Sequence, residues 1–173
     1  MTGNIGLLRM NARHSPFDNP ATRRALLRAG PNPGSMRAAA GEQTACWRGG
    51  VGFFAPGTPM AGNRGLEATT GPRDAEQARR DIHAAGYGGE RVVLLSPGDH
   101  PRIAAPAAVA ADLRSRCGLS VDVREMDWGS VVQRRASKAA PGQQGGWSVF
   151  ITIFTGADMS SLAQSAAGLW SMQ

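Results

Sequence analysis

The three histidines, His14, His83 and His100, carry the side chains best suited to act as acids, bases or metal ligands near neutral pH. None has a second histidine or a cysteine four residues away, the spacing that would place two ligands on one helix face. Asp99 precedes His100, but adjacent side chains point in different directions. The histidines therefore predict no catalytic site and no metal site.

Two other segments resemble catalytic or nucleotide-binding motifs only in part. The glycine-rich run 49–57 (GGVGFFAPG) lacks the lysine and hydroxyl residue that complete a phosphate-binding loop. Ser96 lies in SPGDH and not in the GxSxG turn that exposes a nucleophilic serine. We therefore expect no enzymatic activity and no cofactor.

The two cysteines, Cys46 and Cys117, leave the question of a disulfide open. A disulfide requires their Cα atoms to lie within about 7 Å, which the sequence cannot show. Two separate thiols are the simpler expectation, and the residues around them have no metal-binding spacing.

The composition indicates one globular domain with an alanine- and glycine-rich core. Of the 173 residues, 42% are hydrophobic and 6% aromatic, and the net charge is +6. All but one of the 19 basic residues are arginines, the exception being Lys138. A small basic nucleic-acid-binding domain is therefore the alternative interpretation; it would use five arginines, namely Arg23, Arg24, Arg28, Arg134 and Arg135. A continuous positive face would favour that alternative, and scattered charge would disfavour it.

No targeting or membrane segment is apparent. The N-terminal residues 1–16 lack a basic region followed by a long apolar region, so they do not form a signal peptide. No run of 18 apolar residues occurs. Expressed as written, the chain is expected to be cytoplasmic.

From residue 74 onward, the hydrophobic pattern predicts helices alternating with strands. Helices are expected after Asp74, from Pro101 or Ala104, and over 129–138, with Asp74 and Asp127 as caps. The second helix is expected to bury Ala108, Ala111, Leu113 and Cys117. Strands are expected over 91–96, 120–124 and 148–154, in one sheet that is at least partly parallel.

The N-terminal half is less regular. Residues 5–10 (IGLLRM) are predicted to form a strand, and 21–29 a helix that begins at Pro20 with Asn19 as its cap. At least one helical turn is expected over 36–40. Between residues 49 and 71, glycine and proline recur too often for regular structure.

Five segments in this order resemble the C-terminal lobe of extracellular solute-binding proteins of family 5, the peptide/nickel class. They are FFAPGTP (53–59), DAEQARRDIHAAGY (74–87), ERVVLLS (90–96), DWGSVVQRR (127–135) and GGWSVF (145–150). The resemblance runs from GLLRMNARHSPFD (6–18) to Trp170.

This resemblance implies the fold and the function. The fold would be α/β, one lobe of a type II periplasmic-binding-protein-like receptor, with a mixed or parallel sheet flanked by helices. Residues 1–173 would form a single, incomplete C-terminal lobe without its N-terminal lobe. The function would be capture of a peptide or similar small polar solute for an ABC importer, in contact with its membrane subunits and, by resemblance, in the periplasm. No nucleic acid is expected as a partner.

The resemblance also implies the ligand-binding residues, which are Trp147, Phe150, Asp158 and Phe54. Peptide receptors of this family often have an aspartate three residues after the tryptophan that corresponds to Trp147, where it holds the ammonium group of the peptide. This chain has Phe150 there. Asp158 is the nearest remaining carboxylate; it either lines the cleft or caps a helix over 160–167.

A lobe without its partner is expected to leave apolar surface uncovered. The residues expected to contribute to that surface are Phe53, Phe54, Trp147 and Phe150.

Overall fold

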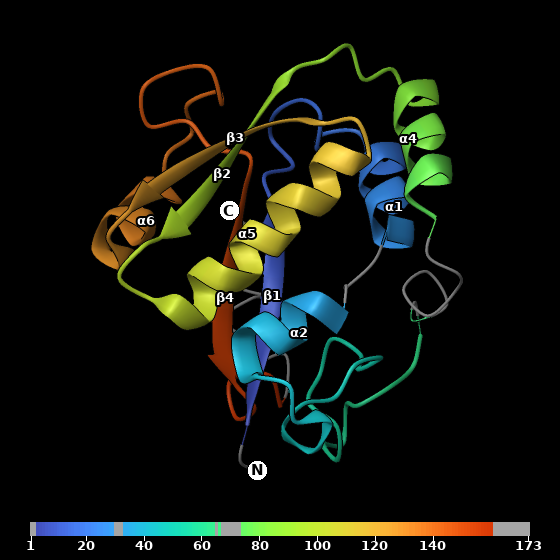
Figure 1. Ribbon diagram of the computed structural model, residues 1–173, viewed down its shortest axis with the longest axis vertical. Helices are drawn as coiled ribbons and strands as arrows, with labels where there is room; N and C mark the ends of the chain where they lie inside the picture. The colour runs from blue at the N-terminus through green and yellow to red at the C-terminus, as the bar shows by residue number, and fades with distance from the viewer. Residues whose placement is uncertain (1–2, 30–32, 65, 67–73, 161–173) are drawn as a thin grey trace.

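The computed structural model describes residues 3–29, 33–64, 66 and 74–160. In chain order its elements are β1 (Asn4–Met10), α1 (Pro20–Ala29), α2 (Pro33–Ala40), the short 3₁₀ helix η1 (Thr44–Cys46), α4 (Ala75–Ala84), β2 (Arg91–Pro97), α5 (Pro101–Arg116), β3 (Ser120–Met126), α6 (Trp128–Arg134) and β4 (Val149–Thr155). Figure 1 shows α5 crossing the sheet, with α1 and α4 on one side of the molecule and α6 on the other.

The four strands form one mixed sheet in the order β1-β4-β2-β3. Strand β2 is parallel to both of its neighbours, β3 and β4, and β4 is antiparallel to β1. The chain reaches each parallel neighbour through a helix, as parallel strands require. The predicted α/β fold with a partly parallel sheet is therefore confirmed.

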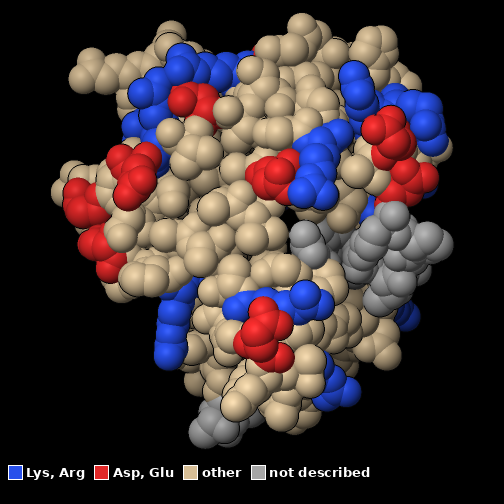
Figure 2. All heavy atoms as spheres, in the orientation of Figure 1, with Lys and Arg blue, Asp and Glu red and all other residues tan. Residues whose placement is uncertain are grey.

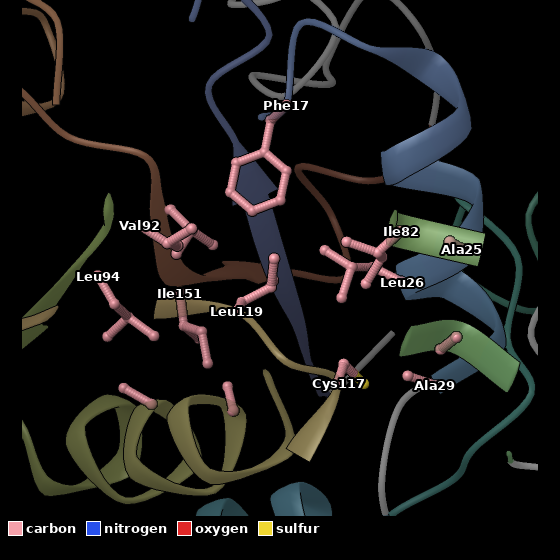
Figure 3. Close-up of a cluster of buried hydrophobic side chains, with 14 of the residues drawn as sticks. Phe17, Ala25, Leu26, Ala29, Ile82, Val92, Leu94, Cys117, Leu119 and Ile151 are labelled. Carbon is pink, nitrogen blue, oxygen red and sulfur yellow. The ribbon is translucent and has the colours of Figure 1, made fainter. Parts of the chain in front are cut away.

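The first face of the sheet carries the main core. Its side chains come from alternate positions of β2 and β4, and α1, α4 and α5 cover them (Figure 3). The fully buried members include Val92, Leu94, Val149 and Phe17. Strand β2 is buried on both faces, which explains why residues 92–95 form a continuous apolar run with no alternation.

Helices α1, α4 and α6 each begin directly after the predicted cap residue, whereas His100 before α5 makes no capping bond through its side chain. The Asn19 Oδ1 accepts a 2.8 Å hydrogen bond from the backbone N–H of Ala21. Asp74 and Asp127 accept from the N–H groups of Gln77 and Ser130. These side chains satisfy backbone donors that the first turn of a helix leaves without a partner.

Two predicted elements differ from the structure. Helix α5 buries Ile103, Ala107 and Ala110, whereas Ala108, predicted to face inward, is exposed. Alanines occupy both faces of this helix, so they mark no clear stripe, and the buried stripe itself contains the charged Arg114. Helix α6 ends at Arg134 and not at residue 138, because the next N–H groups bond three residues back, as in a 3₁₀ turn.

The loop prediction holds for the described residues between 49 and 64, which form neither helix nor strand. The remainder of that loop and the helix predicted over 160–167 lie outside the described residues, apart from Leu66 and Ser160.

Leu94 is fully buried in the central strand β2, so shortening its side chain would leave a cavity in the core. We expect Leu94→Ala to lower the free energy of unfolding by about 2–5 kcal/mol. The matched control is Leu27→Ala, because Leu27 is 38% exposed on α1 and should cost less than about 1 kcal/mol. Urea unfolding monitored by circular dichroism measures both, and equal losses would contradict this account of the core.

Candidate functional site

The second face of the sheet carries one predicted ligand-binding residue, Phe150, and Trp147 packs in the same cluster. This face is defined by the alternate strand residues that point away from α5, which are Ile5, Leu7, Arg9, Val93, Leu95, Phe150, Thr152 and Phe154. Two apolar clusters lie on this face. One contains Trp147 and Phe150, and the other contains Phe154 together with the loop residue Ala55 and Met159.

Trp147 and Phe150 pack together beside α6. Their rings meet edge to face, with centroids 5.1 Å apart, and Val131 of α6 covers them. Only 8% of Trp147 and 2% of Phe150 is exposed. The predicted uncovered apolar surface is therefore wrong at these two residues, since α6 and the edge contact between the rings bury both.

Backbone hydrogen bonds fix the segment that carries Trp147. Asn11 donates through Nδ2 to the Trp147 carbonyl at 3.0 Å and through its N–H to the Ser148 carbonyl at 2.8 Å. Ser148 donates its N–H to the Val93 carbonyl, and its Oγ accepts from the Val93 N–H at 3.0 Å. Trp147 is thus positioned by β2 and by the end of β1 together.

Phe54 and Asp158 lie in two neighbouring segments at the opposite end of β4. The Ala55 N–H donates to the Met159 carbonyl at 2.8 Å, which joins the loop that carries Phe54 to the turn that carries Asp158. Phe54 also contacts Phe53 edge to face at 5.0 Å and lines a hollow of about 240 Å³ in its own loop. Phe53 is 48% exposed, as predicted, whereas Phe54 is half-buried.

The Asp158 carboxylate closes its own turn. Its Oδ2 accepts from the Thr155 hydroxyl at 2.7 Å and from the Thr155 N–H at 3.0 Å. These bonds favour the charged form, so they lower the pKa of Asp158 below its ordinary value. Neither predicted role is tested by this bond, because the residues of the predicted helix lie outside the described part.

The structure therefore places Trp147 and Phe150 together beside α6, and it places Phe54 and Asp158 in two segments that join beyond the other end of β4. Phe150 and Phe154 mark the two ends, roughly 13 Å apart along β4 at about 3.3 Å per residue. Between the ends lies the buried Thr152, which pairs with Leu7 of β1. The second face is therefore largely apolar with few polar groups, a composition that small-solute sites share.

Two arginines on this face were not predicted as ligand-binding residues. Arg9 lies directly opposite Phe150 in the β1–β4 pairing. Arg135 follows Val131 by four residues, so it extends from the face of α6 that covers Phe150. The available sequence signal was the position of Arg9, the one charged residue in the strand NIGLLRM.

Charge on the surface is mixed. Figure 2 shows arginine and lysine side chains interspersed with aspartate and glutamate on the visible face. Three of the five arginines considered for nucleic-acid binding are engaged locally, Arg23 with the Phe17 carbonyl, Arg28 with Asp81 and Arg134 with the Gly146 carbonyl. Helices α1 and α6, which carry most of the five, lie on opposite sides of the molecule (Figure 1). This distribution disfavours one nucleic-acid-binding face.

Neither cysteine is in a disulfide; Cys46 is exposed and Cys117 is buried, and burial raises the pKa of the Cys117 thiol. Across residues 3–29, 33–64, 66 and 74–160, no three His, Cys, Asp or Glu side chains gather as a metal site would require. In the same ranges, no helix has the length and apolar character needed to cross a bilayer.

Gly146, which precedes Trp147, lies where the backbone leaves no room for a larger side chain. A Cβ at this position would overlap the Ala140 carbonyl. We expect Gly146→Ala to lower the free energy of unfolding by about 1–3 kcal/mol, because the loop must move and Arg134 then loses its bond to the Gly146 carbonyl.

The matched control for Gly146→Ala is Gly142→Ala in the same loop, where nothing lies within 4 Å of the added Cβ. This variant should be neutral or stabilising by about 0.4–1 kcal/mol. Thermal unfolding compares the two, and a tolerated Gly146→Ala would mean that the loop before Trp147 is not held as described.

The Asp158 turn predicts a change in titration. In Thr155→Val the carboxylate loses the hydroxyl donor, so the pKa of Asp158 should rise toward its ordinary value. Because the folded-state pKa is lowered, the turn contributes stability above the unfolded pKa and loses it as the pH falls through the folded pKa.

Carboxyl-carbon NMR titration measures this change in Thr155→Val. Asp127, whose pKa is lowered chiefly by the Ser130 hydroxyl, serves as the internal reference, and its pKa should not change. An unchanged pKa of Asp158 in this variant would show that the Thr155 hydroxyl does not stabilise the charged carboxylate.

Similar proteins were found by sequence and by structure. Residues 1–167 match the model of the bacterial extracellular solute-binding proteins, family 5, middle region. A probable peptide ABC transporter periplasmic-binding protein of Sinorhizobium fredii, y4tO, is 36% identical over 153 residues, which is 84% of this chain and 27% of that protein. The di/tripeptide-binding protein 2 of Pseudomonas aeruginosa is 28% identical over 131 residues, 72% of this chain and 23% of that protein.

Among solved structures, the clavulanic acid biosynthesis oligopeptide binding protein 2 superposes with a TM-score of 0.71 at 24% identity, covering 96% of this chain and 30% of that one. This likeness shows that the fold is that of one part of a solute-binding protein. The chain spans about a quarter of the length of the curated relatives that it matches. Since the family match extends from residue 1 to residue 167, the chain belongs to the bacterial extracellular solute-binding proteins of family 5.

Proposed function

We propose that this chain forms one lobe of the solute receptor of an ABC importer, and that the receptor binds a peptide or a similar small polar solute in the bacterial periplasm. The observation that carries the proposal is the family match over residues 1–167, together with the second face of the sheet. The relative from Sinorhizobium fredii, a probable peptide ABC transporter periplasmic-binding protein, supports the choice of solute. The membrane subunits of the importer are the proposed protein partners.

In this proposal the second face forms one wall of the binding cleft. Trp147 and Phe150 lie beneath this wall at the α6 end, where Val131 covers them, and their packing keeps the wall rigid. Phe54 and Asp158 border the wall at the other end of β4. The second lobe of a complete receptor would supply the opposite wall and close over the solute by a hinge motion.

In the proposed receptor, Phe150 determines how strongly the amino group of a solute is bound. A phenyl ring cannot form the charge-assisted hydrogen bond that a carboxylate gives to an ammonium group, a bond contributing roughly 1.5–3 kcal/mol. A receptor built from this chain and a matching N-terminal lobe should therefore distinguish poorly between a peptide with a free amine and its N-acetylated form.

Calorimetric titration with both peptides checks this prediction. Equal dissociation constants, within about threefold, are expected, whereas a carboxylate at position 150 would give about ten- to a hundredfold preference for the free amine. A strong preference for the free amine in this receptor would mean that another carboxylate, Asp158 first, holds the ammonium group. The Asp158→Asn receptor would then lose that preference.

A further inference from the structure

Strand β3 is the end strand of the sheet, so one of its two edges has no neighbouring strand. Successive residues of a strand direct their backbone N–H and C=O groups to opposite edges. On the inner edge, the Met126 carbonyl accepts a 2.9 Å hydrogen bond from the N–H of Gly98, which follows β2. The even-numbered residues of β3 therefore face β2. The backbone groups of Val121, Val123 and Glu125 point to the outer edge, and no described residue forms a hydrogen bond with them.

The side chains of β3 limit which strand can pair with this outer edge. An open edge is a template for another strand, and charged residues block it where like charges would meet. Strand β3 carries three charged residues, Asp122, Arg124 and Glu125. Its middle residue, Val123, is apolar and 46% exposed. These four side chains can be tested against every way in which a second copy of β3 could lie alongside the first.

Only one antiparallel register about a two-fold axis sets opposite charges against each other. An axis at Asp122, Arg124 or Glu125 would place that residue opposite its own copy, and like charges directly opposite destabilise a strand pair. An axis at Val123 places Asp122 opposite Arg124 of the second copy, and because the interface is two-fold this contact occurs twice.

The register centred on Val123 also suits the backbone and the apolar side chain. Val123 is the midpoint of β3 (Ser120–Met126), so the two strands overlap along their full length. The outward groups of Val123 bond to those of its own copy, and those of Val121 bond to those of Glu125, as in hydrogen-bonded antiparallel pairs. The two exposed valines come together and cover each other.

We propose that two copies of this chain associate through β3, antiparallel about a two-fold axis at Val123, so that the two four-stranded sheets become one continuous sheet. Within each copy, Asp122 already forms ion pairs with Arg91 and Arg124. Arg124 of the second copy would extend these pairs into a network, and networks stabilise more than isolated surface pairs do. This self-association goes beyond the proposed receptor function.

The first test uses the unaltered 173-residue chain. Sedimentation equilibrium between about 10 µM and 1 mM should show a monomer–dimer equilibrium, because small interfaces bind weakly. Amide hydrogen exchange, followed by ¹⁵N NMR over the same series, should slow at Val121, Val123 and Glu125, by about tenfold when roughly nine chains in ten are paired. The amides of Asp122 and Arg124, which already face β2, are the internal control and should not change with concentration.

Charge-reversed variants test the register. Asp122→Arg and Arg124→Asp each place two like-charged pairs in the dimer, so each alone should associate about tenfold or more weakly. An equimolar mixture of the two variants should associate again, because each chain then carries the charges that complement the other. The matched control is Arg91→Gln, which removes an ion pair of Asp122 inside one chain and should change the dissociation constant by no more than about twofold.

The outcomes decide the inference one way or the other. Dimers that persist in either single variant, or a mixture that stays monomeric, would overturn it. If a variant loses its circular dichroism spectrum, the exchange measurement on the unaltered chain decides. Slow exchange of the three outer amides at every concentration would mean that the edge is covered within one chain, and a chain that stays monomeric throughout would equally overturn the inference. The receptor function would stand in either case, because the second face is formed by β1, β2 and β4.

Discussion

Strand β4 carries the constraint on which the other parts of this fold depend, because it pairs with two strands at once. It is antiparallel to β1, the first strand of the chain, and parallel to β2, the most buried one. Only two residue pairs, Leu94–Val149 and Leu95–Phe150, join β4 to β2. The hydrogen bonds of Ser148 to Val93 extend this short ladder backward, and they hold Trp147 in place as a consequence.

The two faces of this sheet have different requirements. On the first face, three helices bury aliphatic side chains, so packing alone decides which residues are suitable. On the second face, the same strands carry apolar clusters at both ends, with Thr152 between them and Arg9 opposite Phe150 at the α6 end. The first face therefore contributes most of the apolar packing that stabilises the domain.

The sequence predicted the strands, their membership of one sheet and the capped helix starts, because β-branched runs and Asp or Asn caps are local signals. It predicted the buried face of α5 only in part: Ala111, Leu113 and Cys117 pack in or against the core as expected, but Ala108 is exposed, since alanine packs on either face and Arg114 interrupts the apolar stripe. Arg114 is buried, with its Nη1 bonded to the Ala110 carbonyl and its pKa lowered to about 10 by burial. Arg9 and Arg135 were missed as a pair because their proximity arises only when β1 pairs with β4 and α6 covers that sheet edge.

The same geometry explains what Phe150 contributes to the fold. Its backbone pairs with Arg9 of β1 and with Leu95 of β2, and its ring meets Trp147 edge to face beside Val131. A carboxylate at this buried position would need a counter-charge or several hydrogen-bond donors to offset its loss of hydration. A phenyl ring needs neither, so packing against Trp147 and Val131 is enough to stabilise it there.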